Sequence, residues 1–436
     1  MKIKRLGRMN KPYANTLPFK KQDFTHHFKL LFNSKTKKNI THLNQMVRDL
    51  SRPRLKIAIV TETWPPEING VALSVMQLCK GLQNQGHKIL LIRPAQKKQC
   101  ADFSPDKECL VNAQSIPKYP DMKFGWPQFL KVSQAIASFS PDVVHIVTEG
   151  PLGFTALHAA KIKRIPVSSG FHSQFQEFSR FFDLAFLVKP IQGYLKWFHN
   201  ATQLTCVPSR DTALALREFG VTCPLVVVGR GVDTQRFSSQ RYSESLRQQW
   251  GACAETTVLI YVGRLSSEKE VNVVVDAYAT LRKQTTRKVK LVLVGDGPDR
   301  ARLEKLANSD DVIFMGSLSG TQLAEAYASA NVFVFASQVE TFGNVVIEAM
   351  ASGLPVIAYN YACAQLHAKH QQSGWLCSIG DKGHLTQFIL DLPDNSTLKK
   401  MGQQAMQDVQ SSGWQHPVKQ FEDALYQVKQ KTKLLA

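Results

Sequence analysis

The sequence predicts a protein of two doubly wound α/β domains that face each other across a cleft. Two series of short apolar runs support this prediction, because each run is separated from the next by a segment of helical length, as in buried parallel sheets. The first series begins at Lys56 and the second at Val258. A short apolar run followed by two glycines, residues 226–233, lies between the two series and is the expected hinge. The length of 436 residues suits two to three domains at about 150 residues each.

The first series begins with a β-α-β unit. Residues 56–60 form an apolar run, residues 61–70 a polar loop that ends in Gly70, and residues 71–85 a helical pattern. Gly86 ends that helix, and residues 88–92 are the next expected strand. Three further strands are expected at residues 142–147, 165–169 and 203–207.

The second series repeats the alternation. Strands are expected at residues 258–262, 290–294, 312–314, 332–335 and 355–358, with helices at 300–307 and 320–329. The chain is thereby divided into a basic tail, a first α/β domain, a second α/β domain and a C-terminal helix that packs back on the first domain; these are residues 1–54, 55–228, 229–410 and 411–436. Ligands of such sheets bind at the carboxyl ends of the strands, so the cleft is the expected site.

The charge of the chain is concentrated at its start. The net charge is +20, and residues 1–54 hold fourteen Lys or Arg against Asp23 and Asp49. This tail is interpreted as a solvated leader or as an attachment to an anionic membrane surface. A role in binding nucleic acid has no supporting motif, so no nucleic acid is expected as a partner.

The eight cysteines are scattered and include no C-x-x-C pair, which is typical of reduced thiols in a cytosolic protein. No apolar stretch reaches the roughly 18 residues that a membrane-spanning helix needs. We therefore expect a cytoplasmic protein, peripheral at most to the inner face of the plasma membrane.

The segment of residues 338–355 carries the strongest chemical signal. Glu340 follows the expected strand 332–335, Gly343 opens a helix, and Glu348 lies about one turn into that helix. Free N–H groups and the positive end of the helix dipole suit a diphosphate. Taken alone, the two carboxylates could equally be surface charges.

Five motifs in order make the interpretation more specific. Glu340 and Glu348, with the following Ala-Met-Ala-Ser-Gly-Leu-Pro, resemble the E-x7-E segment of retaining GT-B glycosyltransferases of family 4. The other four resemble the G-R-L-x-x-x-K segment, the Gly-Pro loop, the donor loop and the inter-domain signature of that family; they are residues 262–269, 293–298, 65–70 and 229–237. The resemblance extends over about 380 residues from Lys56.

The resemblance implies that residues 55–228 are the acceptor-side domain and residues 229–410 the nucleotide-sugar-binding domain, and it implies roles for residues on the donor side. Arg264 and Lys269 match a basic pair on the donor diphosphate, where a planar guanidinium and a point charge would stabilise the departing group. Glu340 would contact hydroxyls of the donor sugar and Glu348 those of the ribose. Gly70 would let its loop approach the diphosphate closely. The expected donor-binding set is completed by Phe342, Gly343 and Asn344.

The acceptor side departs from the common pattern. Many members carry H-x-H where this chain has His145-Ile-Val, so the second histidine is missing. The following Thr-Glu-Gly-Pro is similar to a mannosyltransferase-like branch, in which His172 also has a counterpart. His172 is either near the reacting sugar or structural. Glu149 either positions the acceptor, interacts with the developing oxocarbenium, or has neither role. For His145 a structural role is favoured.

Retaining transfer in the family is written as front-face substitution, in which the leaving phosphate takes the proton of the acceptor. No side chain then has to attack, and catalysis depends on positioning and charge stabilisation. The chain contains no Asp-x-Asp, the usual carboxylate signature of a metal-held sugar nucleotide. We therefore expect neither a metal nor another cofactor.

The resemblance implies transfer of a hexose, above all mannose from GDP-mannose, to an envelope glycolipid or glycan. A UDP-sugar donor, a phosphorylase or epimerase, and a non-catalytic nucleotide-binding scaffold remain alternatives. The aromatic segment of residues 181–198 is either core or a lipid-facing acceptor surface. An NAD oxidoreductase is disfavoured, because no G-x-G-x-x-G follows a strand.

Overall fold

The computed structural model describes residues 52–67, 70–96, 102–116, 119–172 and 185–435. The basic tail lies outside the described residues except for its last three positions, so its interpretations stay predictions. In the aromatic segment, residues 181–184 and the side chains of residues 185–188 are also outside the described part.

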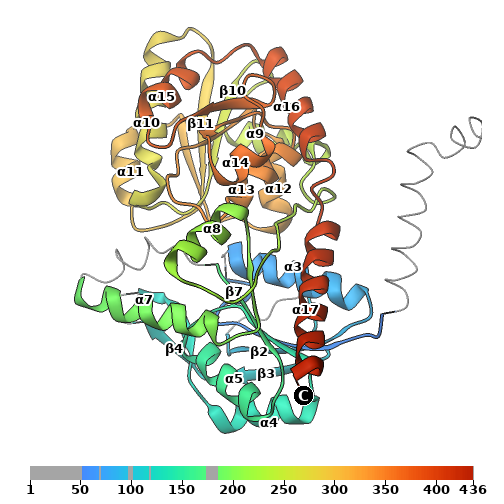
Figure 1. Ribbon diagram of the computed structural model, residues 1–436. Helices are drawn as coiled ribbons and strands as arrows, with labels where there is room; N and C mark the ends of the chain where they lie inside the picture. Colours follow the sequence, from blue (N-terminus) through green and yellow to red (C-terminus); the bar gives the residue numbers. More distant parts are fainter. Residues whose placement is uncertain (1–51, 68–69, 97–101, 117–118, 173–184, 436) are drawn as a thin grey trace, which may run out of the picture. The chain divides into compact units, whose positions relative to one another are not determined.

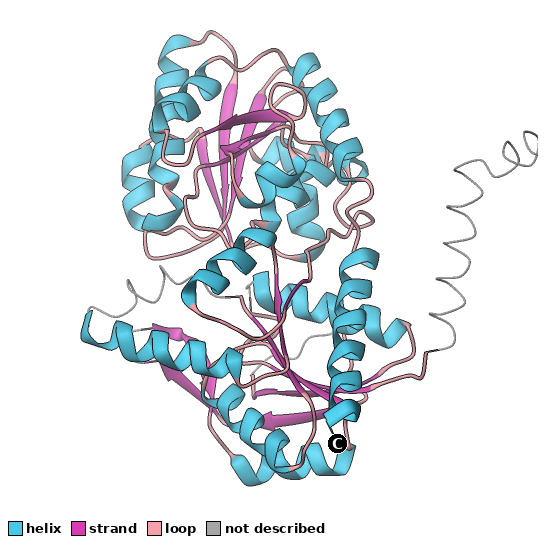
Figure 2. Ribbon diagram, viewed as in Figure 1, coloured by secondary structure: helices cyan, strands magenta, loops and turns pink. Residues whose placement is uncertain are grey.

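The first described domain is built on a sheet of seven parallel strands, as the alternation predicted (Figure 2). In spatial order the strands are β3 (Lys107–Val111), β2 (Lys88–Pro94), β1 (Lys56–Val60), β6 (Val143–Ile146), β7 (Val167–Gly170), β8 (Leu204–Val207) and β9 (Leu225–Val227). A separate antiparallel pair is formed by β4 (Ala113–Ile116) and β5 (Tyr119–Gly125).

Both faces of this sheet are covered by helices, which is why its central strands β1, β6, β7 and β8 are buried at every position except Lys56. In β1, Ile57 and Ile59 pack into one core cluster and Ala58 and Val60 into another, on opposite faces. The helices of the domain are α3 (Gly70–Asn84), α4 (Phe129–Phe139), α5 (Pro151–Ile162), α7 (Ala185–Asn200) and α8 (Arg210–Phe219).

The second domain repeats the architecture with a six-stranded parallel sheet (Figure 1). In spatial order its strands are β12 (Val312–Gly316), β11 (Val289–Val294), β10 (Thr257–Val262), β13 (Val332–Phe335), β14 (Val356–Tyr359) and β15 (Gly374–Cys377). One continuous core cluster fills this domain. It contains five of the six residues of β10, all but Thr257.

Helices surround the second sheet. They are α9 (Glu244–Gln249), α10 (Val271–Gln284), α11 (Arg300–Ala307), α12 (Gly320–Ala328), α13 (Asn344–Ala351), α14 (Ala362–His367), α15 (Lys382–Leu390) and α16 (Asn395–Val409), with the short 3-10 turns η1 (Ser239–Arg241) and η2 (Ser267–Lys269).

The last helix, α17 (Gln415–Leu435), returns to the first domain (Figure 1). It contacts α3, β6, β7 and β8. Its Phe421 and Leu425 join the core cluster that contains Leu78 and Leu82 of α3. The first domain therefore draws part of its core from the C-terminal end of the chain.

Both sheets reverse their strand order at one point. In the first sheet the reversal lies between β1 and β6, and in the second between β10 and β13. In open α/β sheets, ligands bind outside the carboxyl ends of the strands at this point. The loops that follow β10 and β13 are therefore where a ligand of the second domain is expected.

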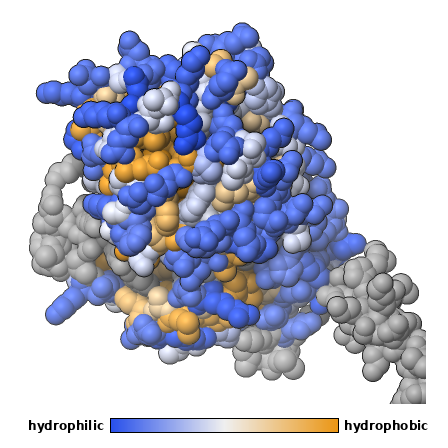
Figure 3. All heavy atoms as spheres, turned by 90° about the horizontal axis from the view of Figure 1, so that it is seen from above, coloured by the Kyte–Doolittle hydropathy of each residue, from blue (hydrophilic) through white to orange (hydrophobic). Residues whose placement is uncertain are grey.

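Much of the face seen in Figure 3 is hydrophilic, with hydrophobic areas between the polar side chains. Within the described ranges, no helix combines the length and the apolar character needed to cross a bilayer. The seven cysteines of the described ranges are free thiols, and six of them are buried.

Candidate active site

Lys269 and Glu340 come together at the reversal point of the second sheet. Lys269 ends the turn η2 after β10, and Glu340 lies in the loop after the neighbouring strand β13. Lys269 Nζ donates to Glu340 Oε1 at 2.6 Å and to the carbonyl oxygen of Val339 at 2.8 Å. Each side chain is 16% exposed, so the ion pair is accessible from solvent while its geometry is fixed.

Arg264 lies on the same loop with its side chain exposed. Its backbone is fixed from two sides: Tyr261 Oη donates to the Arg264 carbonyl at 3.0 Å, and Leu265 N donates to the Asp296 carbonyl at 3.0 Å. The second contact needs Gly295, because a Cβ there would lie 1.9 Å from the Gly263 carbonyl oxygen. The Gly-Pro loop after β11 therefore supports the loop that carries Arg264.

The head of α13 meets the head of α3. Gly343 caps α13 with φ of 86°, a left-handed conformation that favours glycine. The next residue, Asn344, donates from Nδ2 to Ser74 Oγ at 3.3 Å. A Cβ on Gly70, the first residue of α3, would lie 3.8 Å from the same Nδ2. Gly70, Gly343 and Asn344, which were predicted from separate motifs, are thus neighbours.

Asn344 also has an unused polar atom. Its Oδ1 is buried and has no hydrogen-bond partner among the described residues. Such an acceptor costs free energy unless something donates to it. It is therefore available to a ligand donor at the head of α13.

A pocket opens beside the Glu340 loop. Glu340, Phe342 and Gly343 line it together with Tyr361 and Cys363. Phe342 is 6% exposed, so its ring belongs mainly to the wall of this pocket and the domain core. Tyr361 Oη donates to the Ser337 carbonyl at 2.9 Å, which holds the wall opposite the loop in place.

Glu348 lies on the second turn of α13 and is half-buried. Tyr327 Oη donates to its Oε2 at 3.2 Å. Burial raises the pKa of Glu348 to about 7, and the hydrogen bond from Tyr327 and the charge of Arg236 only partly oppose this effect. The carboxyl is consequently poised between its two protonation states at neutral pH.

Glu149 has partners within the first domain. Its Oε1 lies 3.1 Å from His199 Nε2, and its carbonyl oxygen accepts from Tyr194 Oη at 2.5 Å. His199 Nδ1 in turn lies 3.0 Å from Ser169 Oγ. These contacts support a structural role for Glu149. A role of Glu149 in positioning the acceptor stays a prediction.

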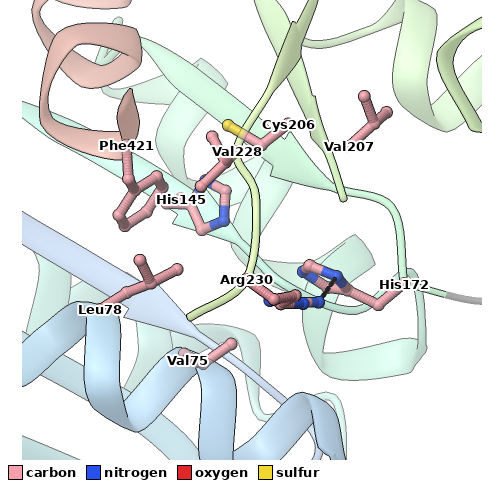
Figure 4. A pocket seen from close by; sticks show the side chains of 9 residues that line it. All are labelled: Val75, Leu78, His145, His172, Cys206, Val207, Val228, Arg230 and Phe421. Atoms are coloured by element: carbon pink, nitrogen blue, oxygen red, sulfur yellow. Dashed lines mark hydrogen bonds between the residues drawn. The ribbon is translucent and has the colours of Figure 1, made fainter. Parts of the chain in front are cut away.

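His172 lies after β7 and contacts a residue that the sequence interpretation did not single out. Arg230 Nη2 lies 2.8 Å from His172 Nδ1, and both side chains line a pocket with His145 (Figure 4). His145 is buried against Phe421 of α17, with 4.7 Å between the ring centroids. Burial lowers the pKa of His145 to about 3, so this ring is neutral.

Sequence reasoning missed four residues of this arrangement: Glu62, Ser74, Arg230 and Tyr327. Glu62 is a buried carboxyl with a pKa of about 7, raised by burial. Arg230 lies inside the inter-domain signature, and Glu62 inside the polar loop after β1, so both had a positional signal. Ser74 and Tyr327 lie on helix faces that nothing in the sequence pattern distinguishes.

Comparisons with known proteins decide the family. Residues 68–236 match the family described as Glycosyltransferase Family 4, and residues 242–408 match Glycosyl transferases group 1. A GDP-mannose-dependent alpha-mannosyltransferase of Mycobacterium tuberculosis is 32% identical over 76% of this chain and 85% of its own length. The chain belongs to glycosyltransferase family 4.

Other relatives of this family 4 glycosyltransferase have different names. The sulfoquinovosyl transferase SQD2 of Arabidopsis thaliana is 28% identical over 84% of this chain and 72% of its own length. The alpha-monoglucosyldiacylglycerol synthase of Streptococcus pneumoniae is 28% identical over 70% of this chain and 71% of its own length.

Solved structures confirm the GT-B fold. Sucrose-phosphate synthase from Thermosynechococcus elongatus matches with a TM-score of 0.67 at 20% identity, covering 86% of this chain and 99% of its own. Anabaena HepE, solved with UDP and glucose, matches with a TM-score of 0.66 at 21% identity, covering 86% of this chain and 100% of its own.

The geometry gives this glycosyltransferase a cationic, hydrogen-bonding end on its second sheet. Lys269, the head of α13 and the Arg264 loop offer donors, while Glu340 and Glu348 offer acceptors. Among the described residues, no three His, Cys, Asp or Glu side chains gather as a metal site would require. The metal independence of the transfer stays a prediction.

Proposed function

We propose that this family 4 glycosyltransferase transfers mannose from GDP-mannose, with retention, to an envelope glycolipid or glycan. The relative from Mycobacterium tuberculosis supports mannose and GDP, since its name gives both the donor and the α linkage. The names of the plant and streptococcal relatives support a lipid acceptor in part, because one of them is a diacylglycerol glycoside synthase.

The donor would be held at the reversal point of the second sheet. Lys269 and Arg264 bind the diphosphate together with the free N–H groups at the head of α13, whose macrodipole favours negative charge. Glu340 accepts hydrogen bonds from hydroxyls of the sugar, and Glu348 from those of the ribose. Binding the diphosphate pulls Lys269 away from a purely internal ion pair with Glu340.

Catalysis would then stabilise the leaving group. As the bond from the sugar to the phosphate oxygen breaks, negative charge grows on the diphosphate, and two cations in fixed positions lower the energy of that state. The acceptor hydroxyl forms the new bond on the same face and gives its proton to the leaving phosphate oxygen. Donor and acceptor must be positioned closely, and no divalent ion is required.

The observation that carries this proposal is the contact of Lys269 with Glu340 at the carboxyl ends of β10 and β13. The test is a titration of the purified protein with GDP-mannose, GDP-glucose and UDP-glucose, each with and without EDTA. We expect GDP-mannose to bind and to be slowly hydrolysed in both conditions. Absence of binding and hydrolysis for every donor would overturn the proposal, and loss of activity in EDTA would overturn its metal-independent form.

Two substitutions separate binding from turnover. We expect Glu348→Ala to raise the Kd of the donor, because the ribose hydroxyls lose their acceptor. Arg264→Ala should chiefly lower kcat, roughly tenfold or more, because its guanidinium acts on charge that develops during transfer. Arg302→Ala, which removes an exposed guanidinium from α11, is the control. Unchanged kinetics in both variants would contradict the site.

A UDP-sugar is the second candidate donor. It is favoured by the streptococcal relative, whose name specifies a glucosyl product at 28% identity. The two donors share the diphosphate and ribose, so the same residues would hold them. Competition of GDP against UDP for the free enzyme distinguishes the two donors, since the nucleotide with the lower Kd identifies the base that the site prefers.

Contact with an anionic membrane completes the proposal. On the surface of α5 and α7, the rings of Phe154 and Tyr194 lie 5.9 Å and 6.0 Å from Trp197, which is 44% exposed. Lys161 Nζ lies 5.9 Å from the same Trp197 ring. Aromatic rings beside lysines suit the interface of a bilayer, where rings enter the headgroup region and cations meet anionic lipid.

The membrane contact is tested by sedimentation with vesicles. We expect the protein to bind phosphatidylglycerol vesicles more strongly than phosphatidylcholine vesicles, and Trp197→Ala to weaken binding several-fold. Trp126→Ala, which removes an exposed Trp elsewhere on the first domain, is the control. Equal binding of both lipids, or no effect of Trp197→Ala, would contradict this surface.

A further inference from the structure

Arg230 is a buried cation in the connector between the two domains. It follows β9 by three positions and is only 8% exposed. The connector is fixed on both sides of it: Gly229 N donates to Gln420 Oε1 of α17 at 3.0 Å, and Val232 N donates to the Ser412 carbonyl at 2.9 Å. The side chain of Arg230 therefore extends from a segment of backbone that is held in place on both sides.

The partner of this cation is an imidazole. Arg230 Nη2 lies 2.8 Å from His172 Nδ1 (Figure 4). Among the described residues, no Asp or Glu lies within ion-pair distance of Arg230. Burial lowers the pKa of Arg230 to about 10, so the guanidinium still keeps its charge at neutral pH. A buried Arg is ordinarily paired with a carboxylate, so this pairing requires a reason.

The contact decides where the proton of His172 lies. A guanidinium has donors and no acceptor, so the His172 Nδ1 that faces it must be the unprotonated nitrogen. The proton of the neutral ring is consequently on Nε2. Burial, the charge of Arg230 and the neighbouring His145 and His199 hold the pKa of His172 well below its usual range.

The other ring nitrogen is directed over β7. A Cβ on Gly170 would lie 2.5 Å from His172 Nε2 and 3.4 Å from His145 Nε2, so only glycine leaves room for both rings. The Nδ1 of His145 is directed toward Ser168 and lies 3.0 Å from Ser168 Oγ. The N–H group on Nε2 therefore lies beside Gly170, on a ring that lines the pocket together with Arg230.

We propose that Arg230 is a positioning residue that fixes His172 as a neutral imidazole with its proton on Nε2. His172 then donates a hydrogen bond to a substrate oxygen and does not act as a general base. This inference deepens the proposed transfer reaction, in which the leaving phosphate takes the acceptor proton and no protein base is needed. It also gives the connector a chemical function besides joining the domains.

Ring nitrogen NMR tests the tautomer without any substrate. The protein is labelled with ¹⁵N in its histidine rings, and the signal of His172 is assigned by its loss in His172→Gln. In the wild type we expect protonated Nε2, unprotonated Nδ1 and no titration between pH 6 and pH 8. In Arg230→Met the proton distributes over both nitrogens and the pKa of His172 rises, because a neighbouring cation has been removed.

Wild-type protonation on Nδ1, or an unchanged His172 signal in Arg230→Met, overturns the proposal. Arg217→Met, which removes an exposed guanidinium from α8 of the same domain, should leave the His172 signal unchanged. If Arg230→Met does not fold, Arg230→Lys still tests the contact, since it keeps a cationic donor and should keep the wild-type tautomer. The NMR result stands whether or not any sugar donor is found.

Kinetics test the function of the tautomer. His172→Ala should lower kcat roughly tenfold, the effect of about one lost hydrogen bond. His172→Gln should recover part of this loss, because its amide places an N–H donor near the position of Nε2. Arg230→Met should cause no further loss in the His172→Ala background. Equal loss in the Ala and Gln variants, or additive loss in the double variant, overturns the donor role.

Discussion

Glu348 and Lys269 lie on different elements of the second domain, and their environments differ. Lys269 forms an ion pair with Glu340 at 2.6 Å, whereas the carboxyl of Glu348 accepts a hydrogen bond from the hydroxyl of Tyr327. Burial outweighs this hydrogen bond and the charge of Arg236, so the pKa of Glu348 rises to about 7. A proposed ligand of ribose hydroxyls is therefore partly protonated at neutral pH.

This raised pKa predicts a pH-dependent donor affinity. Ribose hydroxyls donate to the ionised carboxylate, so the donor prefers the form that is present above pH 7. The Kd of GDP-mannose should fall about tenfold between pH 6 and pH 8, because one pKa unit corresponds to about 1.4 kcal/mol. Isothermal titration calorimetry across this range measures the effect, and Glu348→Gln should abolish the dependence. A flat wild-type profile would contradict the ribose role.

The proximity of the residues proposed for the donor site was largely predictable from the sequence. Glu340, Phe342, Gly343 and Asn344 lie in one loop and helix head, so their proximity follows from chain continuity. The meeting of Lys269 with Glu340 followed only from the resemblance, because 71 positions separate them. Arg230 was not singled out, since its partner His172 lies 58 positions away and no local pattern links the two.

Helix α5 illustrates how an element of the first domain is stabilised at its head. No side chain of its own caps this helix, which begins with Pro151 after Gly150. The carboxyl of Glu62, from the loop after β1, accepts from Leu152 N at 2.9 Å and from Gly125 N. One buried side chain thus satisfies donors of a helix and of β5, as the free N–H groups of a helix head require.

This arrangement predicts a large loss of stability in Glu62→Ala. Removing the carboxyl leaves buried N–H groups unpaired, at roughly 1–3 kcal/mol for each. Urea denaturation should show this loss, while Glu218→Ala on the exposed surface of α8 should change the free energy of unfolding little. Equal stability of the two variants would mean that water or backbone movement satisfies the head of α5.

The pH dependence of this contribution has a defined sign. Burial raises the pKa of Glu62 to about 7, above the usual value of 4.5. The folded protein therefore binds this proton more tightly than the unfolded chain, so the contribution of Glu62 is fully present below pH 4.5 and is lost as the pH rises through 7. The difference in stability between wild type and Glu62→Ala should shrink over that interval.

Strands were predictable where they are central and apolar. The strands β10, β11 and β13 were predicted to within one residue from their mainly apolar sequences, because both faces of the sheet are covered. The edge strands β3 and β15 were missed. In β3, Lys107 and Glu108 are exposed, and β15 has only four residues with two of them half-buried, so neither carries the signal of a buried strand.

The two domains of the whole molecule are not two separate segments of chain. The expected division gives the first domain residues 55–228 and places the C-terminal helix of residues 411–436 against it, and the core cluster between β1 and α3 contains Val418, Phe421 and Leu425 of α17. A Cβ on Gly81 of α3 would lie 2.2 Å from Val418 Cγ2, which shows how closely the two helices pack. The sequence predicted which domain this helix covers, whereas the side chains that it contributes to the core are given only by the long-range packing.

This shared core predicts that a change near the C-terminus destabilises the N-terminal domain. Phe421 is 2% exposed and packs on His145 of β6. Truncating such a ring costs about 3–5 kcal/mol, so Phe421→Ala should lower the urea midpoint strongly. Hydrogen exchange should locate the loss in β1, β6 and α3, with β10 and β13 still protected. Gln427→Ala on the exposed face of the same helix is the matched control. Loss of protection confined to the second domain, or equal midpoints for both variants, would show that α17 does not belong to the core of the first domain.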